Sequence, residues 1–306
     1  MPKSIDIDSK NYSVKEFVEK LNFDECVFDL LKFIEKDNKK VKDFLITKYL
    51  GASLPANTEE YVLEYFINNS VFSAATMANP ATSIVTELLY VRPNLNHPID
   101  KYFLASKSGK AIRSRIEKVE ENIHSLIEKY FEKNEKVLIG NVGGGPSRDI
   151  SDVFSKYYVD NDNIDAVSID RDGFSIKRGK LLAKIGNVEN KIDFLGINFM
   201  KHKPKKKFDI ILLVGVLCGL PSETCVLVLK NTKRMLARGG CIMASNVTPK
   251  MLEDDPFTYF LMEKILNWKL IFKEEELLKN IFRKSGLKWQ QNFTDEYGFH
   301  NMGIGI

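Results

Sequence analysis

The sequence predicts an α/β fold in which a mostly parallel sheet follows an all-helical region. Up to about residue 130, apolar side chains recur three and four positions apart, the spacing of helices buried along one face. After Asn134, short β-rich runs alternate with helical segments, as in βαβ units. The first of these runs ends in three consecutive glycines, Gly143 to Gly145. We therefore divide the 306 residues into a helical domain, 1–130, and a sheet domain, 131–306.

Composition places the chain among ordinary globular proteins. It is 44% hydrophobic and 28% charged, with a net charge of +4. The longest apolar stretch, 210–220, is shorter than the ~20 residues that span a bilayer. The N-terminal residues lack the apolar region of a signal peptide, which predicts a cytoplasmic location. The basic run "KHKPKKK" (201–207) is interpreted as a solvated loop, because no aromatic residues interleave it. We do not expect nucleic acid as the partner.

Neither cysteine nor histidine patterns indicate a metal or disulfides. The four cysteines, Cys26, Cys218, Cys225 and Cys241, form no CxxC pair, and most lie in apolar runs. They are interpreted as reduced structural thiols. The four histidines are scattered along the chain, so no metal site is expected.

The helical region begins with three amphipathic segments at 13–21, 24–36 and 39–50. Asp24 is the expected N-cap of the second. Further helices are expected at 59–69 and, after Pro80, at 81–90. A turn-rich break at 91–98 precedes a long helix from about Gly109 to Phe131. We expect this region to cover a pocket and shape a substrate site, and a role in a homodimer stays open.

The second region contains five predicted parallel strands. They are 136–142, 164–170, 191–197, 208–216 and 240–247. The clearest intervening helix is 222–240, with Ser222 as N-cap and Gly239 as C-cap. The last residues, 287–306, are predicted to form two strands around a turn, an antiparallel pair at the sheet edge.

The glycine-rich turn after the first strand predicts a cofactor cradle. Glycines let the backbone approach a ligand, and the following helix offers its free N–H groups. The dinucleotide fingerprint GxGxxG fails here, because Arg148 or Val142 stands where a glycine is needed. A P-loop is excluded because no GK[ST] follows. A nicotinamide dehydrogenase is accordingly the weakest interpretation.

The segment "NVGGGPS" resembles motif I of the class I S-adenosylmethionine-dependent methyltransferases, which have a Rossmann-like sheet. In this resemblance Gly143 and Gly145 are the first two motif glycines, with Gly144 between them, and Ser147 replaces the third. Asn141 stands where the family has an acid, and its amide oxygen can still accept a hydrogen bond.

The resemblance continues through the later strands. "AVSIDRD" is similar to motif II, which implies that Asp170 binds both ribose hydroxyls and that Arg171 flanks the adenine. "FLGIN" implies that Ile197 packs on adenine with Asn198 near its amino group. The segment "FDIILLVGVLCGLP" resembles motif IV, which places Gly215 and Val216 in the loop beneath the methionine part. The implied cofactor is S-adenosylmethionine.

The acceptor and the catalytic residues are less well marked. Methyl transfer is an in-line displacement that demands positioning, and it needs a base only when the acceptor must lose a proton. No residue stands out as catalytic. The candidates weighed are His97, Tyr102, Tyr259, His300, Cys218 and two arginines that could meet the methionine carboxylate, Arg113 and Arg115. Each has a packing or surface alternative.

The expected reaction is methylation of a small, apolar molecule, at oxygen. The aromatic-rich segment 255–272 either lines the acceptor pocket or packs in a core. The motif of base-methylating enzymes, [DN]-P-P-[FYW], is absent from the fourth strand. The alternatives left open are transfer of the aminocarboxypropyl group, RNA methylation through 201–207, and a non-catalytic scaffold with this fold.

Overall fold

The computed structural model describes residues 12–52, 54–78, 83–133 and 136–306, and the chain divides into two compact units. The first comprises Met1–Lys110 with Leu252–Lys269, and the second Ala111–Met251 with Leu270–Ile306. The second unit thus begins inside the long helix, about twenty residues before the boundary that the sequence suggested. Residues 1–11, which are expected to contain no signal peptide, lie outside the described residues, and so does the start of the helix predicted at 81–90.

The first unit is helical. Its helices are α1 (Val14–Lys20), α2 (Glu25–Asp37), α3 (Lys39–Tyr49), α4 (Ala56–Asn69), α5 (Val71–Ala78), α6 (Ser83–Val91), α7 (Pro98–Ala105) and α13 (Pro256–Phe260), and a π-helical turn follows at Leu261–Ile265. The predicted cap of α2 is confirmed, because the Asp24 carboxylate accepts a hydrogen bond from the Val27 N–H.

Phe257 packs into a cluster of aromatic side chains in this unit. Its ring is fully buried and lies within 6.4 Å of the Phe17, Phe23 and Tyr49 rings, measured between centroids. Aromatic pairs at such distances add stability beyond the area they bury. The inserted segment Leu252–Lys269 therefore supplies part of the core of the helical unit.

The second unit is built on one seven-stranded sheet. The strands are β1 (Val137–Val142), β2 (Ile164–Asp170), β3 (Ile192–Gly196), β4 (Phe208–Leu213), β5 (Leu236–Val247), β6 (Trp289–Thr294) and β7 (His300–Gly305). Their order is β3-β2-β1-β4-β5-β7-β6. The first five run parallel, whereas β7 is antiparallel to β5 and to β6. The predicted sheet and its antiparallel C-terminal edge are confirmed.

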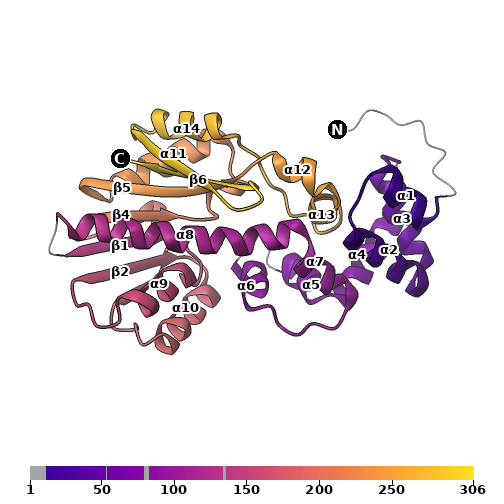
Figure 1. Ribbon diagram of the computed structural model, residues 1–306, viewed down its shortest axis with the longest axis horizontal. Coiled ribbons are helices and arrows are strands. Elements are labelled where there is room, and N and C mark those ends of the chain that lie inside the picture. Colours follow the sequence, from indigo (N-terminus) through magenta and orange to yellow (C-terminus); the bar gives the residue numbers. More distant parts are fainter. Residues whose placement is uncertain (1–11, 53, 79–82, 134–135) are drawn as a thin grey trace. The chain divides into compact units, whose positions relative to one another are not determined.

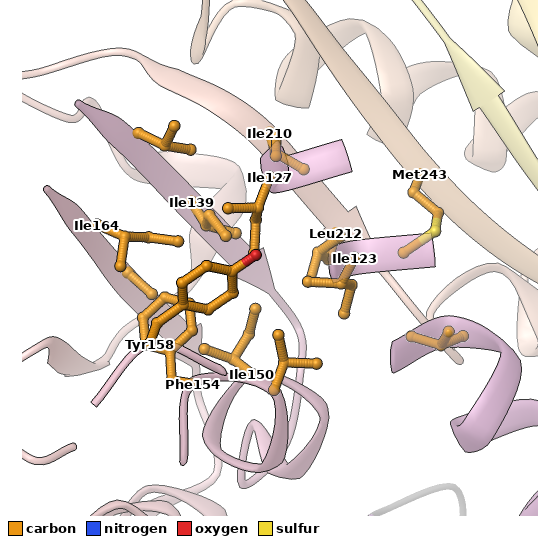
Figure 2. Close-up of a cluster of buried hydrophobic side chains, with 14 of the residues drawn as sticks. Ile123, Ile127, Ile139, Ile150, Phe154, Tyr158, Ile164, Ile210, Leu212 and Met243 are labelled. Atoms are coloured by element: carbon orange, nitrogen blue, oxygen red, sulfur yellow. The ribbon is translucent and has the colours of Figure 1, made fainter. Parts of the chain in front are cut away.

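Helices cover both faces of this sheet (Figure 1). They are α8 (Lys107–Phe131), α9 (Arg148–Tyr157), α10 (Gly173–Ile185), α11 (Ser222–Lys233) and α14 (Glu275–Lys284). On one face, Val119, Ile123 and Ile127 of α8 pack with α9 and α10 against alternate strand residues. Figure 2 shows this cluster, which contains the α8 isoleucines together with Ile139 of β1 and Phe154 of α9. On the other face, α11 and α14 cover the remaining alternate positions.

The predicted helix 222–240 is wrong at its C-terminal end. Helix α11 stops at Lys233, and β5 already begins at Leu236. Gly239 has a φ of +79° inside the strand, at a register shift between β5 and β4. A Cβ on Gly240 would lie 2.9 Å from the Asp209 carbonyl oxygen. The two glycines therefore serve a strand irregularity and a close strand approach rather than a helix stop. Ser222 is the first helical residue and does not cap α11, because no side chain caps this helix.

Candidate functional site

The glycine turn after β1 lies at the carboxyl edge of the parallel strands, where ligands bind in open α/β sheets. Gly143 and Gly145 both adopt left-handed backbone angles, with φ of +64° and +58°. A Cβ on Gly143 would lie 2.9 Å from Val216 Cγ2. Glycine is required here because the turn and the loop after β4 approach each other so closely. The structure thus brings together the predicted motif I and motif IV loops.

Asp170 fixes the glycine turn from the neighbouring strand. Its Oδ2 accepts the Gly145 N–H at 2.9 Å, and its Oδ1 accepts the Asp172 N–H at 2.9 Å. Both bonds are charge-assisted and hold the carboxylate at the end of β2. The first two motifs are therefore linked directly, by one side chain.

Asn141 is completely buried beneath the turn. Its amide nitrogen donates to Ser147 Oγ at 3.1 Å and to Asp149 Oδ1 at 2.9 Å, and Ser147 Oγ donates to Ser168 Oγ at 2.6 Å. Its Oδ1 is buried without a hydrogen-bond partner in the described part of the chain. Because an ionised carboxylate only accepts, the amide must present its nitrogen to Asp149, which leaves the oxygen as an unused acceptor.

Asp149 is a functional candidate that the sequence analysis missed. It lies in the first turn of α9, where an acid is favoured by the helix dipole. Burial raises the pKa of its carboxyl to about 6, although hydrogen bonds from the Ile150 N–H and from Asn141, and the charge of Arg115, oppose the shift. Position 141 thus has an asparagine where the resembling motif has an acid, and an acid eight residues later, Asp149, accepts a hydrogen bond from that asparagine.

Ser147 replaces the third motif glycine in a backbone conformation that glycine prefers. Its φ is +50° and ψ +42°, in the left-handed region, and it precedes α9 as the N-cap residue. A non-glycine residue in this region is uncommon and costs on the order of 1 kcal/mol. Its hydroxyl, hydrogen-bonded to Asn141 and Ser168, supplies compensating contacts.

The loop after β4 is fixed by hydrogen bonds to β5 and to a buried lysine. Gly215 has a φ of +79°, and its N–H donates to Ser245 Oγ on β5 at 2.7 Å. The fully buried Lys273 ammonium donates to the Leu217 carbonyl at 3.0 Å and to Asn246 Oδ1 at 3.1 Å. These contacts fix the position of Val216 next to the glycine turn.

The remaining predicted contacts are placed at the same edge but are exposed. Arg171 follows β2, and Ile197 and Asn198 follow β3. The Asn198 side chain accepts the Met200 N–H at 2.9 Å and so caps a short 3-10 turn, Phe199–Lys201. Their roles toward adenine stay predictions.

Other candidates have structural partners. Within the helical unit, the buried Tyr102 hydroxyl is 2.7 Å from Thr258 Oγ1, and His97 caps α7. Burial raises the pKa of the Cys218 thiol, which suits a packed, protonated group.

The described residues contain no group of histidines, cysteines or carboxylates that could hold a metal ion. None of the described helices has the length and apolarity to cross a membrane.

No protein-family model and no curated protein matches the sequence. Solved structures do match its fold. A protein of Bordetella parapertussis described as a possible exported protein has a TM-score of 0.67 at 12% identity, with 98% of this chain and 99% of that chain covered. The magnesium protoporphyrin IX methyltransferase of Synechocystis, solved with bound S-adenosylhomocysteine, has a TM-score of 0.52 at 12% identity, covering 81% of this chain and 98% of that one. The pyocyanin biosynthetic protein PhzM has a TM-score of 0.51 at 13% identity, with 96% of this chain and 88% of that chain covered. The chain therefore has the class I S-adenosylmethionine-dependent methyltransferase fold.

Proposed function

We propose that the chain binds S-adenosylmethionine at this edge and transfers its methyl group to an oxygen atom of a small, apolar acceptor. The observation that carries the proposal is the Gly145–Asp170 hydrogen bond, which joins the glycine cradle to the acid at the end of β2. Two of the similar structures are a methyltransferase and a biosynthetic protein of a small molecule. These similarities support the choice of reaction and of a small-molecule acceptor.

The residues present fit the cofactor. The buried, unpartnered Asn141 Oδ1 is an acceptor suited to an ammonium group, and the glycines allow a close-packed turn in which a side chain at Gly143 or Gly144 would collide with Val216 or Asn141. Asp170 would hold the ribose diol, with Ile197 and Asn198 beside the adenine and Val216 beneath the methionine part. When bound, the cofactor supplies an electrophilic methyl group on a sulfonium. The chain's own residues orient it and exclude water.

The test is calorimetric titration of the purified protein with S-adenosylmethionine and S-adenosylhomocysteine, with NAD as control. We expect micromolar binding of the first two, no binding of NAD, and loss of binding in Asp170→Ala. The matched control is Asp165→Ala, because Asp165 lies on the same strand but is exposed at its other end. Absence of binding to the wild type would contradict the proposal. If the cofactor binds, mass analysis of the reaction products separates methyl from aminocarboxypropyl transfer.

A further inference from the structure

A buried histidine lies at the carboxyl edge of the sheet, beyond the cofactor loops. His300 begins β7 and pairs in register with Val247, the last residue of β5. Because β7 is antiparallel, its first residue lies beside the carboxyl ends of the parallel strands. The loop after β4 lies two strands away, roughly 10 Å across the sheet at normal strand spacing. The end of β5 lies between the two.

The imidazole is oriented by a buried carboxylate. His300 Nδ1 is 3.1 Å from Asp295 Oδ2, and both residues are at most 5% exposed. The Asp295 carboxylate also accepts the backbone N–H of His300 and, at 2.8 Å, that of Tyr297. Burial opposes ionisation of Asp295, but these hydrogen bonds prevail and lower its pKa. An ionised carboxylate fixes the proton on Nδ1 and leaves the lone pair on Nε2.

The second ring nitrogen of His300, Nε2, is not used in the contact with Asp295. His300 Nε2 has no hydrogen-bond partner among the residues that the structure describes. The charged groups around the ring are Asp295 and, from α8, Arg115. Burial lowers the pKa of His300 and Arg115 lowers it further, while Asp295 opposes the shift, so the ring is neutral near pH 7.

Arg115 connects this histidine to the candidate site. Its charge acts on His300 at one side and on Asp149 and Cys218 at the other. Asp149 contacts Asn141 under the glycine turn, and Cys218 follows Val216 in the loop after β4. One buried guanidinium thus influences the pKa of groups in both places, while the pairing of His300 with Val247 places the histidine at the carboxyl edge of the sheet.

We infer that His300 is the general base of the transfer reaction and that Asp295 is its positioning residue, with a hydroxyl group as the acceptor. This inference rests on the proposed function. In the step, the acceptor O–H gives its proton to Nε2 while its oxygen forms a bond to the methyl carbon. The carbon–sulfur bond breaks and its electron pair stays on sulfur, which becomes a neutral thioether. The imidazolium, stabilised by Asp295, then releases the proton to water.

The experiment compares His300→Gln and Asp295→Asn with the wild type on phenols of graded acidity, from 4-nitrophenol to phenol, with radiolabelled S-adenosylmethionine. General-base catalysis contributes on the order of 10²–10⁴-fold. We expect His300→Gln to lose about that factor on phenol and much less on 4-nitrophenol at alkaline pH, where that probe ionises unaided. Cofactor affinity should be unchanged. The wild-type pH–rate profile should fall on the acid side below the ordinary histidine pKa, and this limb should vanish in His300→Gln and move to lower pH in Asp295→Asn.

His124→Gln is the matched control, because His124 is a half-buried, hydrogen-bonded histidine on α8 in the same unit. An equal loss on all phenols with an unchanged pH profile would overturn the base and leave a packing role. Binding of the cofactor without methylation of any phenol would also overturn it. Absence of cofactor binding would instead refute the proposed function. Nitrogen-15 spectra of histidine-labelled wild type need no variant, and a proton on Nε2 of His300 would contradict the inference.

Discussion

Asn141 fits its position because its amide donates a hydrogen bond to Asp149, so Asn141→Asp should destabilise the protein in a pH-dependent way. The change would restore the acid that the methyltransferase motif has. It would also place two carboxylates about as close as the present donor and acceptor, which are 2.9 Å apart. At an effective dielectric constant of 20, two full charges at that distance repel by about 6 kcal/mol. The native protein can avoid this by keeping one carboxyl protonated.

Protonation sets the magnitude. Holding a proton costs about 1.4 kcal/mol for each pH unit above the ordinary carboxyl pKa, which for Asp149 is 3.8. This is about 4 kcal/mol at pH 6.5 and about 6 kcal/mol at pH 8. A hydrogen bond between the two carboxyls returns about 2 kcal/mol. The net loss should therefore be about 2 kcal/mol at pH 6.5 and about 4 kcal/mol at pH 8.

The sign follows from proton counting. The native variant binds one more proton than its unfolded chain, so its stability falls as pH rises. The wild type has this slope only between the ordinary pKa of Asp149, 3.8, and the value of about 6 to which burial raises it, and it is flat with respect to this group above and below that window. Urea unfolding at the two pH values measures the difference directly.

The double variant Asn141→Asp with Asp149→Asn is the control, because it exchanges donor and acceptor. We expect it to recover most of the lost stability and to lose the pH dependence. A loss in Asn141→Asp that is the same at both pH values would refute the reasoning. So would a double variant no more stable than the single one.

Two further substitutions test the packing around the site. Gly144→Ala should cost about 2–3 kcal/mol in urea unfolding and abolish cofactor binding, because its Cβ would lie 2.2 Å from Asn141 Oδ1 and displace that side chain from its hydrogen bonds. Gly219→Ala, where a Cβ meets nothing within 4 Å, should be near neutral, and equal losses in the two would contradict the steric account. Lys273→Met should cost about 2–4 kcal/mol and weaken cofactor binding, because buried carbonyl acceptors lose their donor. An effect no larger than that of Lys284→Met at the exposed end of α14 would argue against this role for the buried ammonium.

The sheet was predictable from sequence because its signals are local. Each parallel strand is a short apolar run, and the glycine turn marks its own conformation through Gly143 and Gly145. The end of α11 was not predictable in the same way, because Gly239 and Gly240 suit a helix stop as well as a strand irregularity. Only the pairing with β4 decides between them.

The candidate site was predictable where it uses contiguous motifs and not where it uses tertiary contacts. Asn141 and Asp170 lie in recognisable segments. Asp149 could have been suspected as an acid in the first turn of the helix after a glycine turn. The pairing of His300 with Asp295 has no such signal, because it depends on the antiparallel return of β7 beside β5. Sequence patterns do not show which loop meets which strand end.

The inserted segment Leu252–Lys269 has a consequence for dissecting this protein into fragments. The chain leaves the sheet unit after Met251 and returns at Leu270, so the two units are joined covalently at three points rather than one. A fragment ending at Lys110 would lack Phe257 and also Asp255, whose carboxylate accepts the Ser108 N–H and hydroxyl. Neither half is a contiguous piece of sequence. Exchanging the helical unit for that of another protein would require transplanting two separated segments together. A chimera made by recombination at a single junction would leave the core of the helical unit incomplete.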